Sequence, residues 1–310
     1  MIKFMILVVV MFPLVGCTET VRFSVKVTDE EGCPVTNAVV KIETLKRPVF
    51  GMENDPNNLR VIIAHANSNG VVSVKFDSLT ERFIYWLTAE GYYRCPFREV
   101  SYELKEDHLY YVTLAEHEKE DAVVMRKIKK PIPMYSYGSY GAMGLPKGNG
   151  DYGFDMKAGE LVAPFGKGKV ADFYVRKRFD EKTRDTKSAL FFVGKGNGAY
   201  KVKSAMDSEF RSPYAADTNA VFKTEFRYEH LKSEVCDVGE DECLVLRTRC
   251  QYDAEGRLVS CHYSKIYGKI EIYGWLSFWS YAFNPTPNDT NLEFDVEKNL
   301  LDDDVPPGQP

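Results

Sequence analysis

The sequence predicts an all-β protein in which two β-sandwich domains follow a short apolar N-terminal segment. Apolar and polar residues alternate with a period of two in many short segments, and turns rich in Gly, Asn and Asp separate these segments. Beyond the N-terminal segment, no stretch shows the sustained i, i+3, i+4 apolar spacing of an amphipathic helix. The length of 310 residues fits about two domains.

The composition is that of a globular protein without affinity for polyanions. Hydrophobic residues make up 44% and charged residues 27% of the chain, which excludes a mostly disordered or collagen-like protein. The 40 basic and 45 acidic residues give a formal charge of −5. We therefore expect no nucleic-acid partner.

Residues 1–16 are predicted to be a signal peptide. Lys3 precedes an unbroken apolar run over residues 4–12, which is shorter than the roughly 17–25 residues of a membrane-spanning helix. Residues 14–17 (LVGC) resemble the lipobox of bacterial lipoproteins. The resemblance implies cleavage before Cys17, attachment of lipid such as palmitate there, and residues 17–19 as the lipid-anchored N-terminus. The alternative is an ordinary secretory signal with an incidental cysteine.

Residues 20–117 are predicted to form the first sandwich. Val21, Phe23, Val25 and Val27 alternate with polar residues, as on a half-buried strand. Further strands are expected from residue 39, from residue 72, over residues 83–88 and over residues 109–114. Turns are expected at residues 29–32 and 67–70, each ending in a glycine.

Three motifs in this region resemble the carboxypeptidase-regulatory-like domain. Residues 29–40 (DEEGCPVTNAVV) are similar to its opening, residues 68–72 to its glycine turn, and residues 89–92 (AEGY) to its corner. The chain departs from that family by a longer insert over about residues 46–60. The resemblance implies a transthyretin-like or immunoglobulin-like sandwich that acts as a structural or accessory module without catalytic residues.

The second half is predicted to be β-rich and resembles no family. Residues 118–133 are expected to be a linker, residues 134–301 a second antiparallel sandwich, and residues 302–310 a disordered tail. The Gly- and Tyr-rich residues 135–153 are expected to form an irregular loop. A hairpin is expected around residues 253–256 (DAEG).

Candidate catalytic and metal motifs have simpler interpretations. His117 and Glu120 spell H-x-x-E, and His230 could complete a zinc site, but the motif lies in a charged, solvated stretch. The glycines of residues 166–168 and 194–198 favour β-turns over a phosphate-binding loop. We therefore predict no catalytic residue, no metal site and no cofactor.

The strongest candidate for ligand binding is a series of aromatic residues at even spacing: Tyr273, Trp275, Trp279, Tyr281 and Phe283. On one strand these side chains would share a face, with Leu276 and Phe278 on the other. Exposed coplanar rings stack on sugar faces, so this face is a hypothetical carbohydrate-binding platform. The apolar residues on both faces favour the alternative, a central strand that is buried on both sides.

Six cysteines remain after Cys17 and are candidates for disulfides, because an exported protein permits them: Cys33, Cys95, Cys236, Cys243, Cys250 and Cys261. Cys236 could pair with Cys243. Cys250 and Cys261 face each other diagonally across the predicted hairpin, so their pairing depends on its register. Free thiols or a metal site are the alternatives.

Together these features predict a lipoprotein of the cell envelope, in the outer membrane if the source is Gram-negative. The expected role is non-catalytic binding, with carbohydrate or an envelope protein as partner. Two alternatives stay open. One is a structural or accessory envelope component without a small ligand, and the other is a hydrolase acting on polysaccharide or peptide.

Overall fold

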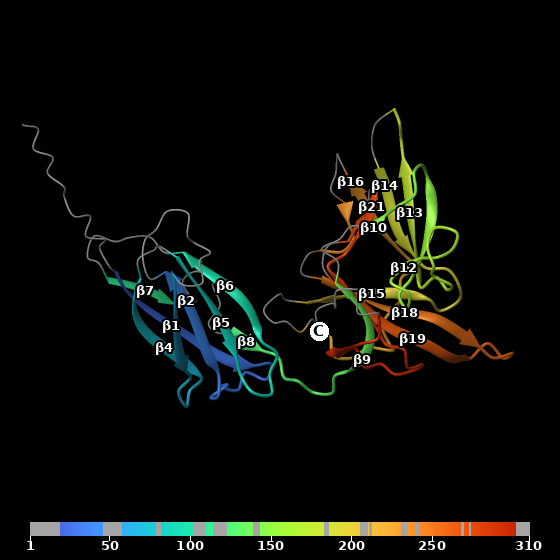
Figure 1. Ribbon diagram of the computed structural model, residues 1–310. Helices are drawn as coiled ribbons and strands as arrows, with labels where there is room; N and C mark the ends of the chain where they lie inside the picture. The colour runs from blue at the N-terminus through green and yellow to red at the C-terminus, as the bar shows by residue number, and fades with distance from the viewer. Residues whose placement is uncertain are drawn as a thin grey trace, which may run out of the picture. The chain divides into compact units, whose positions relative to one another are not determined.

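The computed structural model describes most of the chain between residues 19 and 301. The described residues are 19–45, 58–78, 82–101, 109–113, 123–138, 143–182, 186–204, 210, 213–230, 235–239, 242–267, 270–272 and 274–301. The predicted signal peptide, Cys17, the predicted tail and most of the predicted insert lie outside them. The described part contains β-strands and no α-helix, so the predicted all-β class is confirmed (Figure 1). No helix in this part is long and apolar enough to cross a membrane.

The chain divides into two compact units, residues 1–125 and 126–310. The predicted linker is therefore wrong in detail, because it includes strands of both units. Residues 123–125 form a strand of the first unit, and Ile132 begins a strand of the second. The sequence of the first of these strands, VVM, is too short to show alternation.

The first domain is a sandwich of two four-stranded sheets. One sheet has the path β4-β1-β7 with β8 also paired to β1, and the other has the order β3-β2-β5-β6. Its strands are β1 (Glu19–Asp29), β2 (Val39–Leu45), β3 (Leu59–His65), β4 (Val71–Ser78), β5 (Arg82–Thr88), β6 (Cys95–Ser101), β7 (Leu109–Thr113) and β8 (Val123–Met125).

The core of the first domain lies between the two sheets. The predicted inward residues of β1 are all buried, and Phe23 packs edge-on against Phe83 of the other sheet with ring centroids 5.4 Å apart. Phe76 contacts the same ring at 5.3 Å. Burial of such aromatic side chains dominates core energetics, so these rings hold the sheets face to face.

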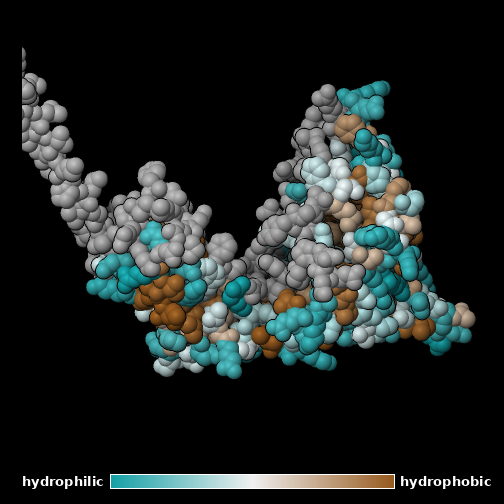
Figure 2. Space-filling model, viewed as in Figure 1, coloured by the Kyte–Doolittle hydropathy of each residue, from teal (hydrophilic) through white to brown (hydrophobic). Residues whose placement is uncertain are grey.

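Strand β3 escapes sequence-based prediction because it is apolar on both faces. Ile62 packs on the core, whereas Val61 and Ile63 on the outer face are 49% and 62% exposed. A run of consecutive apolar residues hides the period of two. Figure 2 shows hydrophobic surface on the visible face of this domain.

The three motifs that resemble the regulatory-like domain act structurally. Asp29 Oδ1 accepts hydrogen bonds from the backbone N–H groups of Glu31 (3.1 Å) and Cys33 (2.8 Å), which closes the first turn. Asn37 donates to the carbonyl of Glu90 at 3.1 Å and thereby ties the first motif to the third. In the second motif, Gly70 has a φ of +73° and packs directly on the first motif.

The second domain contains two six-stranded sheets that pack around a common core. The first sheet, in spatial order, consists of β12 (Glu160–Leu161), β11 (Gly150–Asp155), β13 (Phe173–Phe179), β14 (Thr186–Phe191), β16 (Glu225–His230) and β17 (Val235–Cys236). The second consists of β15 (Gly198–Lys203), β18 (Glu242–Tyr252), β19 (Leu258–Tyr267), β22 (Ser280–Phe283), β9 (Ile132–Gly138) and β23 (Phe294–Asn299). Both sheets contribute buried side chains to one hydrophobic cluster.

A small third sheet packs on the same core. It has the order β10 (Met143–Gly144), β21 (Trp275–Ser277) and β20 (Glu271–Ile272). The prediction of an irregular loop over residues 135–153 is therefore wrong, because β9, β10 and β11 include residues of this range. In β9 the buried Met134 and Ser136 alternate with the half-buried Tyr135 and Tyr137, and aromatic residues suit strands.

We predict that Gly70→Ala destabilises the first domain more than Gly32→Ala. Both glycines have a positive φ, which costs an L-residue about 1–2 kcal/mol. A Cβ at Gly32 meets nothing within 4 Å, whereas one at Gly70 would lie 2.5 Å from the carbonyl oxygen of Val27. Gly70→Ala should therefore cost a further 1–3 kcal/mol, roughly the cost of overpacking. Urea denaturation of both variants measures this difference, and equal losses would contradict it.

Candidate functional site

The aromatic residues near the C-terminus do not lie on one strand. Trp275 belongs to β21 in the small sheet, and Tyr281 belongs to β22 in a six-stranded sheet. Phe278 and Trp279 connect the two strands. Because the chain passes from one sheet to another between β21 and β22, side chains at even spacing do not stay on one face. The prediction of one shared aromatic face is therefore wrong.

Two of the predicted ligand-binding residues nevertheless reach the solvent. Trp275 is 41% and Trp279 is 43% exposed. Leu276 and Phe278, which lie between them in the sequence, are buried in the core of the second domain. The exposed rings are thus attached to a backbone whose neighbouring side chains are held in place by packing.

The backbone beneath Trp275 is also fixed by pairing. Leu276 pairs with Met143 of β10 on one side and with Ile272 of β20 on the other. Ser188 of β14 donates a hydrogen bond from Oγ to the carbonyl of Ile272 at 3.0 Å. A binding surface on such a support needs little ordering when a ligand arrives.

The other two predicted ligand-binding residues do not contribute an exposed ring. Tyr281 is fully buried and donates its hydroxyl to the carbonyl of Met156 at 2.7 Å. Burial, together with the nearby Asp172 and Asp155, raises the pKa of Tyr281 well above its usual value. The ligand-binding role predicted for Tyr281 is therefore wrong, since the residue belongs to the core. Tyr273 lies outside the described residues.

The second domain contains a buried ion network that the sequence analysis missed. Arg249 of β18 contacts Asp155 at the end of β11 and Asp172 just before β13. Arg249 Nη2 lies 2.7 Å from one oxygen of each carboxylate, and Arg249 Nε donates to Asp172 Oδ1 at 2.7 Å. The side chains of both aspartates are at most 6% exposed. The network joins the two six-stranded sheets across the core.

Further donors surround both carboxylates. Asp155 Oδ2 accepts hydrogen bonds from the backbone N–H groups of Lys169 and Val170 at 2.8 and 3.2 Å. Asp172 accepts hydrogen bonds from the Thr248 hydroxyl at 2.9 Å and the Met156 N–H at 2.8 Å. Every oxygen of the pair is thus engaged inside the protein, which suits a structural role.

The protonation of Asp155 agrees with that role. Burial acts to raise the pKa of Asp155, but the backbone N–H groups and Arg249 outweigh it and lower the pKa below its usual value. A general acid near neutral pH needs the opposite shift. The sequence does hold one signal for this pair, because each aspartate stands directly between two apolar residues, in FDM and ADF.

A β-bulge places Arg249 on the inner face of its sheet. Thr248 pairs with His262 and Gln251 pairs with Ser260, so Arg249 and Cys250 together oppose one residue of β19. Arg249 has a φ of +53°, which is uncommon for a residue with a side chain. The extra residue breaks the alternation of β18 and turns Arg249 toward the aspartates.

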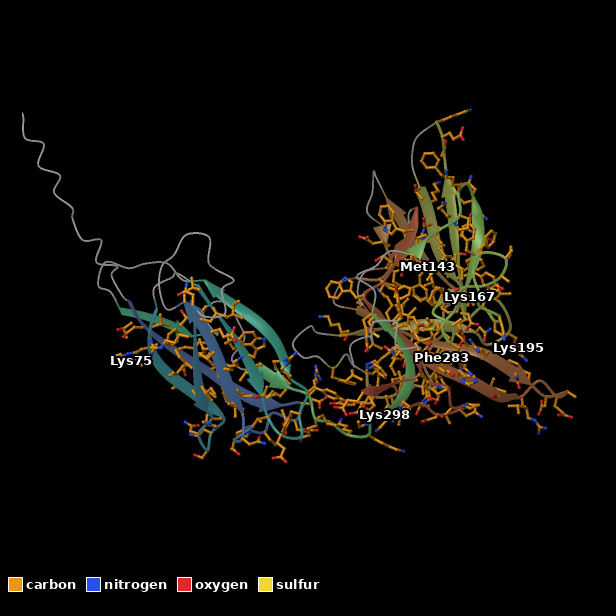
Figure 3. All side chains as sticks on the ribbon, viewed as in Figure 1. Lys75, Met143, Lys167, Lys195, Phe283 and Lys298 are labelled. Carbon is orange, nitrogen blue, oxygen red and sulfur yellow. The ribbon has the colours of Figure 1, made fainter. Side chains whose placement is uncertain are left out.

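Phe283 lies in the interior of the second domain (Figure 3), and its ring contacts the ion network. The guanidinium of Arg249 lies 4.9 Å from the Phe283 ring centroid, and the imidazole of His262 stacks on the same ring at 5.3 Å. Burial is the main cause that lowers the pKa of His262. This shift favours the neutral imidazole, whose Nδ1 lies 3.1 Å from the carbonyl oxygen of Asn284.

Of the predicted disulfide candidates, the structure shows Cys33, Cys250 and Cys261 as free thiols. Cys33 is exposed at a turn, and Cys95 is buried in the core of the first domain. Cys243 is fully buried, with its Sγ 3.6 Å from a backbone carbonyl. Cys250 and Cys261 pack in one cluster on the outer side of β18 and β19. The side chain of Cys236 lies outside the described part.

The other sequence motifs supply no chemistry in the described ranges. Residues 194–198 form a turn in which Gly194 and Gly196 have positive φ values, as predicted. The H-x-x-E motif at residues 117–120 lies outside the described ranges. Within those ranges, no group of three or more His, Cys, Asp or Glu side chains is arranged to hold a metal ion.

Comparison with known proteins identifies no family for this chain. No model of a protein family and no curated protein sequence matches the chain. Among solved structures, the chain is similar to catechol 1,2-dioxygenase from Acinetobacter radioresistens, with 14% identity over 36% of this chain and a TM-score of 0.24. The chain spans about half, 53%, of the length of that dioxygenase. It is also similar to the shaft pilin spaA from Lactobacillus rhamnosus GG, with 10% identity, a TM-score of 0.22, and 80% and 93% of the two chains covered. Scores this low carry no inference about activity.

We predict that Arg249→Met strongly destabilises the second domain. The substitution leaves two buried carboxylates without their cation, which typically costs about 3–5 kcal/mol of unfolding free energy. The matched control is Arg178→Met, because Arg178 Nη2 lies 2.7 Å from Asp151 on the surface and such pairs contribute about 0–1 kcal/mol. Arg249→Lys keeps the charge but not the forked geometry and should rescue part of the loss. Urea denaturation gives the three values, and similar losses for Arg249→Met and Arg178→Met would refute the role of the network.

Proposed function

We propose that this protein is a lipid-anchored component of the cell envelope that binds a ligand without chemical turnover. The anchor is proposed from residues 14–17 (LVGC) after a short apolar run. The first domain then serves as a structural module, in keeping with its resemblance to the regulatory-like domain. The buried carboxylates of Asp155 and Asp172 are fully engaged within the protein, which supports a structural role for this pair.

The observation that carries the binding role is the exposure of Trp275 and Trp279. Large aromatic rings usually lie in cores, so two that are more than 40% exposed on a short, firmly packed segment favour a contact surface. The flat apolar face of an indole ring matches the C–H face of a pyranose sugar. Carbohydrate of the cell surface is therefore the proposed ligand class.

We predict that Trp275→Ala with Trp279→Ala weakens retention of the chain by envelope polysaccharides at least about tenfold, equivalent to about 1.4 kcal/mol. Removing both rings removes the proposed stacking surface, while the buried Leu276 and Phe278 keep the backbone in place. Affinity electrophoresis in gels that contain the polysaccharide measures the change. Trp86→Ala is the matched control, because Trp86 is the third tryptophan and lies in the first domain. Unchanged retention of the double variant, with normal folding, would exclude carbohydrate binding by these two tryptophans.

We predict that Cys17→Ser moves the expressed protein from the membrane fraction to the aqueous fraction. Each buried methylene of an acyl chain contributes about 0.8 kcal/mol to membrane affinity, and the variant has no sulfur to carry such a chain. Detergent phase partition and mass spectrometry of the mature N-terminus follow the change. Cys33→Ser is the control, since Cys33 is an exposed thiol of the first domain. Continued partition of Cys17→Ser into detergent, or a mature chain that does not begin at residue 17, would contradict lipidation there.

A further inference from the structure

The bulge that places Arg249 also brings two thiols together. In a regular ladder, alternation would put Cys250 on the inner face of β18 with Thr248. The extra residue shifts this phase, so Cys250 lies on the outer face beside Cys261 of β19. From the sequence alone, Cys250 and Cys261 face each other diagonally across the hairpin, and their pairing depends on its register. The bulge places the two residues opposite each other.

Both strands are held in place at this point by asparagine side chains. The N–H of Cys250 donates to Asn197 Oδ1 at 3.1 Å, and the N–H of Cys261 donates to Asn288 Oδ1 at 3.0 Å. Cys261 is 1% exposed, whereas Cys250 is only half-buried. The backbone of both cysteines is therefore positioned by these hydrogen bonds. The Cys261 thiol also donates to Asn288 Oδ1 at 3.7 Å, and Cys250 is the member of the pair that solvent can reach.

The pKa of Cys250 agrees with its position beside Cys261. Burial is the largest cause that raises the pKa of Cys250, to about 11, and the charge and hydrogen bond of Cys261 act in the same direction. The neighbouring Arg247 only partly opposes this shift. A thiolate is thus disfavoured at Cys250 beside Cys261.

We infer that Cys250 and Cys261 are a disulfide site that closes the β18–β19 hairpin in an oxidising compartment. The oxidant is a small or protein disulfide, which such compartments supply. Cys250 first gives its proton to solvent, and its thiolate then attacks one sulfur of the oxidant, forms a mixed disulfide and releases one oxidant thiol. Because the pKa of Cys250 is raised, this step is slow at neutral pH and faster at alkaline pH. The Cys261 sulfur then displaces the second oxidant thiol. One sulfur–sulfur bond forms, one breaks, and the two protons and two electrons of the cysteines end on the two released thiols.

The disulfide bond would hold the β-bulge of β18 in place. It joins the residue directly after Arg249 to the strand opposite, so the backbone that orients the buried guanidinium could no longer shift its register. Closing the loop of residues 250–261 also restricts the unfolded chain. The inference uses the proposed export only as the source of the oxidant, and the following test supplies its own oxidant. Failure of this test and failure of the envelope location are therefore distinguishable.

The test incubates the folded full chain in detergent with oxidised glutathione, blocks remaining thiols with iodoacetamide and digests with trypsin. Cleavage at Arg249, Arg257 and Lys265 puts Cys250 in residues 250–257 and Cys261 in residues 258–265. We expect these two peptides joined, with a mass two hydrogens below their sum. The exposed Cys33 is the internal control and should carry glutathione instead, because the structure shows no partner thiol beside it among the described cysteines.

Thermal unfolding gives an independent readout of the same bond. The oxidised protein should unfold about 5–10 °C above the reduced protein, and Cys250→Ser should abolish this difference while Cys33→Ser keeps it. Recovery of residues 250–257 and 258–265 as separate peptides, each with alkylated or glutathione-bearing cysteine, would overturn the inference. So would an oxidised protein that unfolds at the same temperature as the reduced one.

Discussion

The architecture of the second domain depends on one buried cation between two buried anions. Arg249 reaches from one six-stranded sheet to Asp155 and Asp172 of the other, and all three side chains are largely removed from water. Two carboxylates without a counter-ion would be too costly to bury, so the sheets can close only if the guanidinium lies on the inner face. Thr248 and the Met156 N–H complete the coordination of Asp172.

The inward position of Arg249 accounts for the irregular backbone of β18. An inward guanidinium at this position requires an extra residue in β18, and the bulge follows from that requirement. The nearby turn of residues 194–198 is built against the same region, where Arg247 donates to the carbonyl of Gly196 at 2.9 Å. Gly196 has a φ of +79°, and a Cβ there would lie 1.9 Å from the hydroxyl of Tyr252, so glycine is favoured at this position. Arg249 thus accounts for the backbone geometry of β18, and Arg247 and Tyr252 of the same strand contact the neighbouring turn.

The sequence predicts the parts of this fold in which local pattern and burial agree. β1 shows strict alternation because its outer face is polar, and its core residues could be named in advance. β3 could not be identified, because its outward side chains are as apolar as its inward ones. The Gly- and Tyr-rich β9 looks like a loop, yet it is paired on both edges.

The candidate site was predictable only in part, because the sequence does not show where the chain passes from one sheet to another. Exposure of Trp275 and Trp279 follows from a change of sheet between β21 and β22, which even spacing does not reveal. The same change buries Tyr281. The ion network joins residues nearly a hundred positions apart, and its one local signal is an aspartate between apolar neighbours.

The pairing of β1 has a mechanical consequence for a protein held at its N-terminus. β1 runs parallel to β7 over residues 20–24 and parallel to β8 over residues 27–29, and the chain leaves the first domain directly after β8. Tension between the N-terminus and the second domain would pull parallel neighbours in opposite directions along their length. The interstrand hydrogen bonds would then be loaded together in shear rather than opened one at a time, so under the proposed anchoring the first domain would resist tension between its two ends.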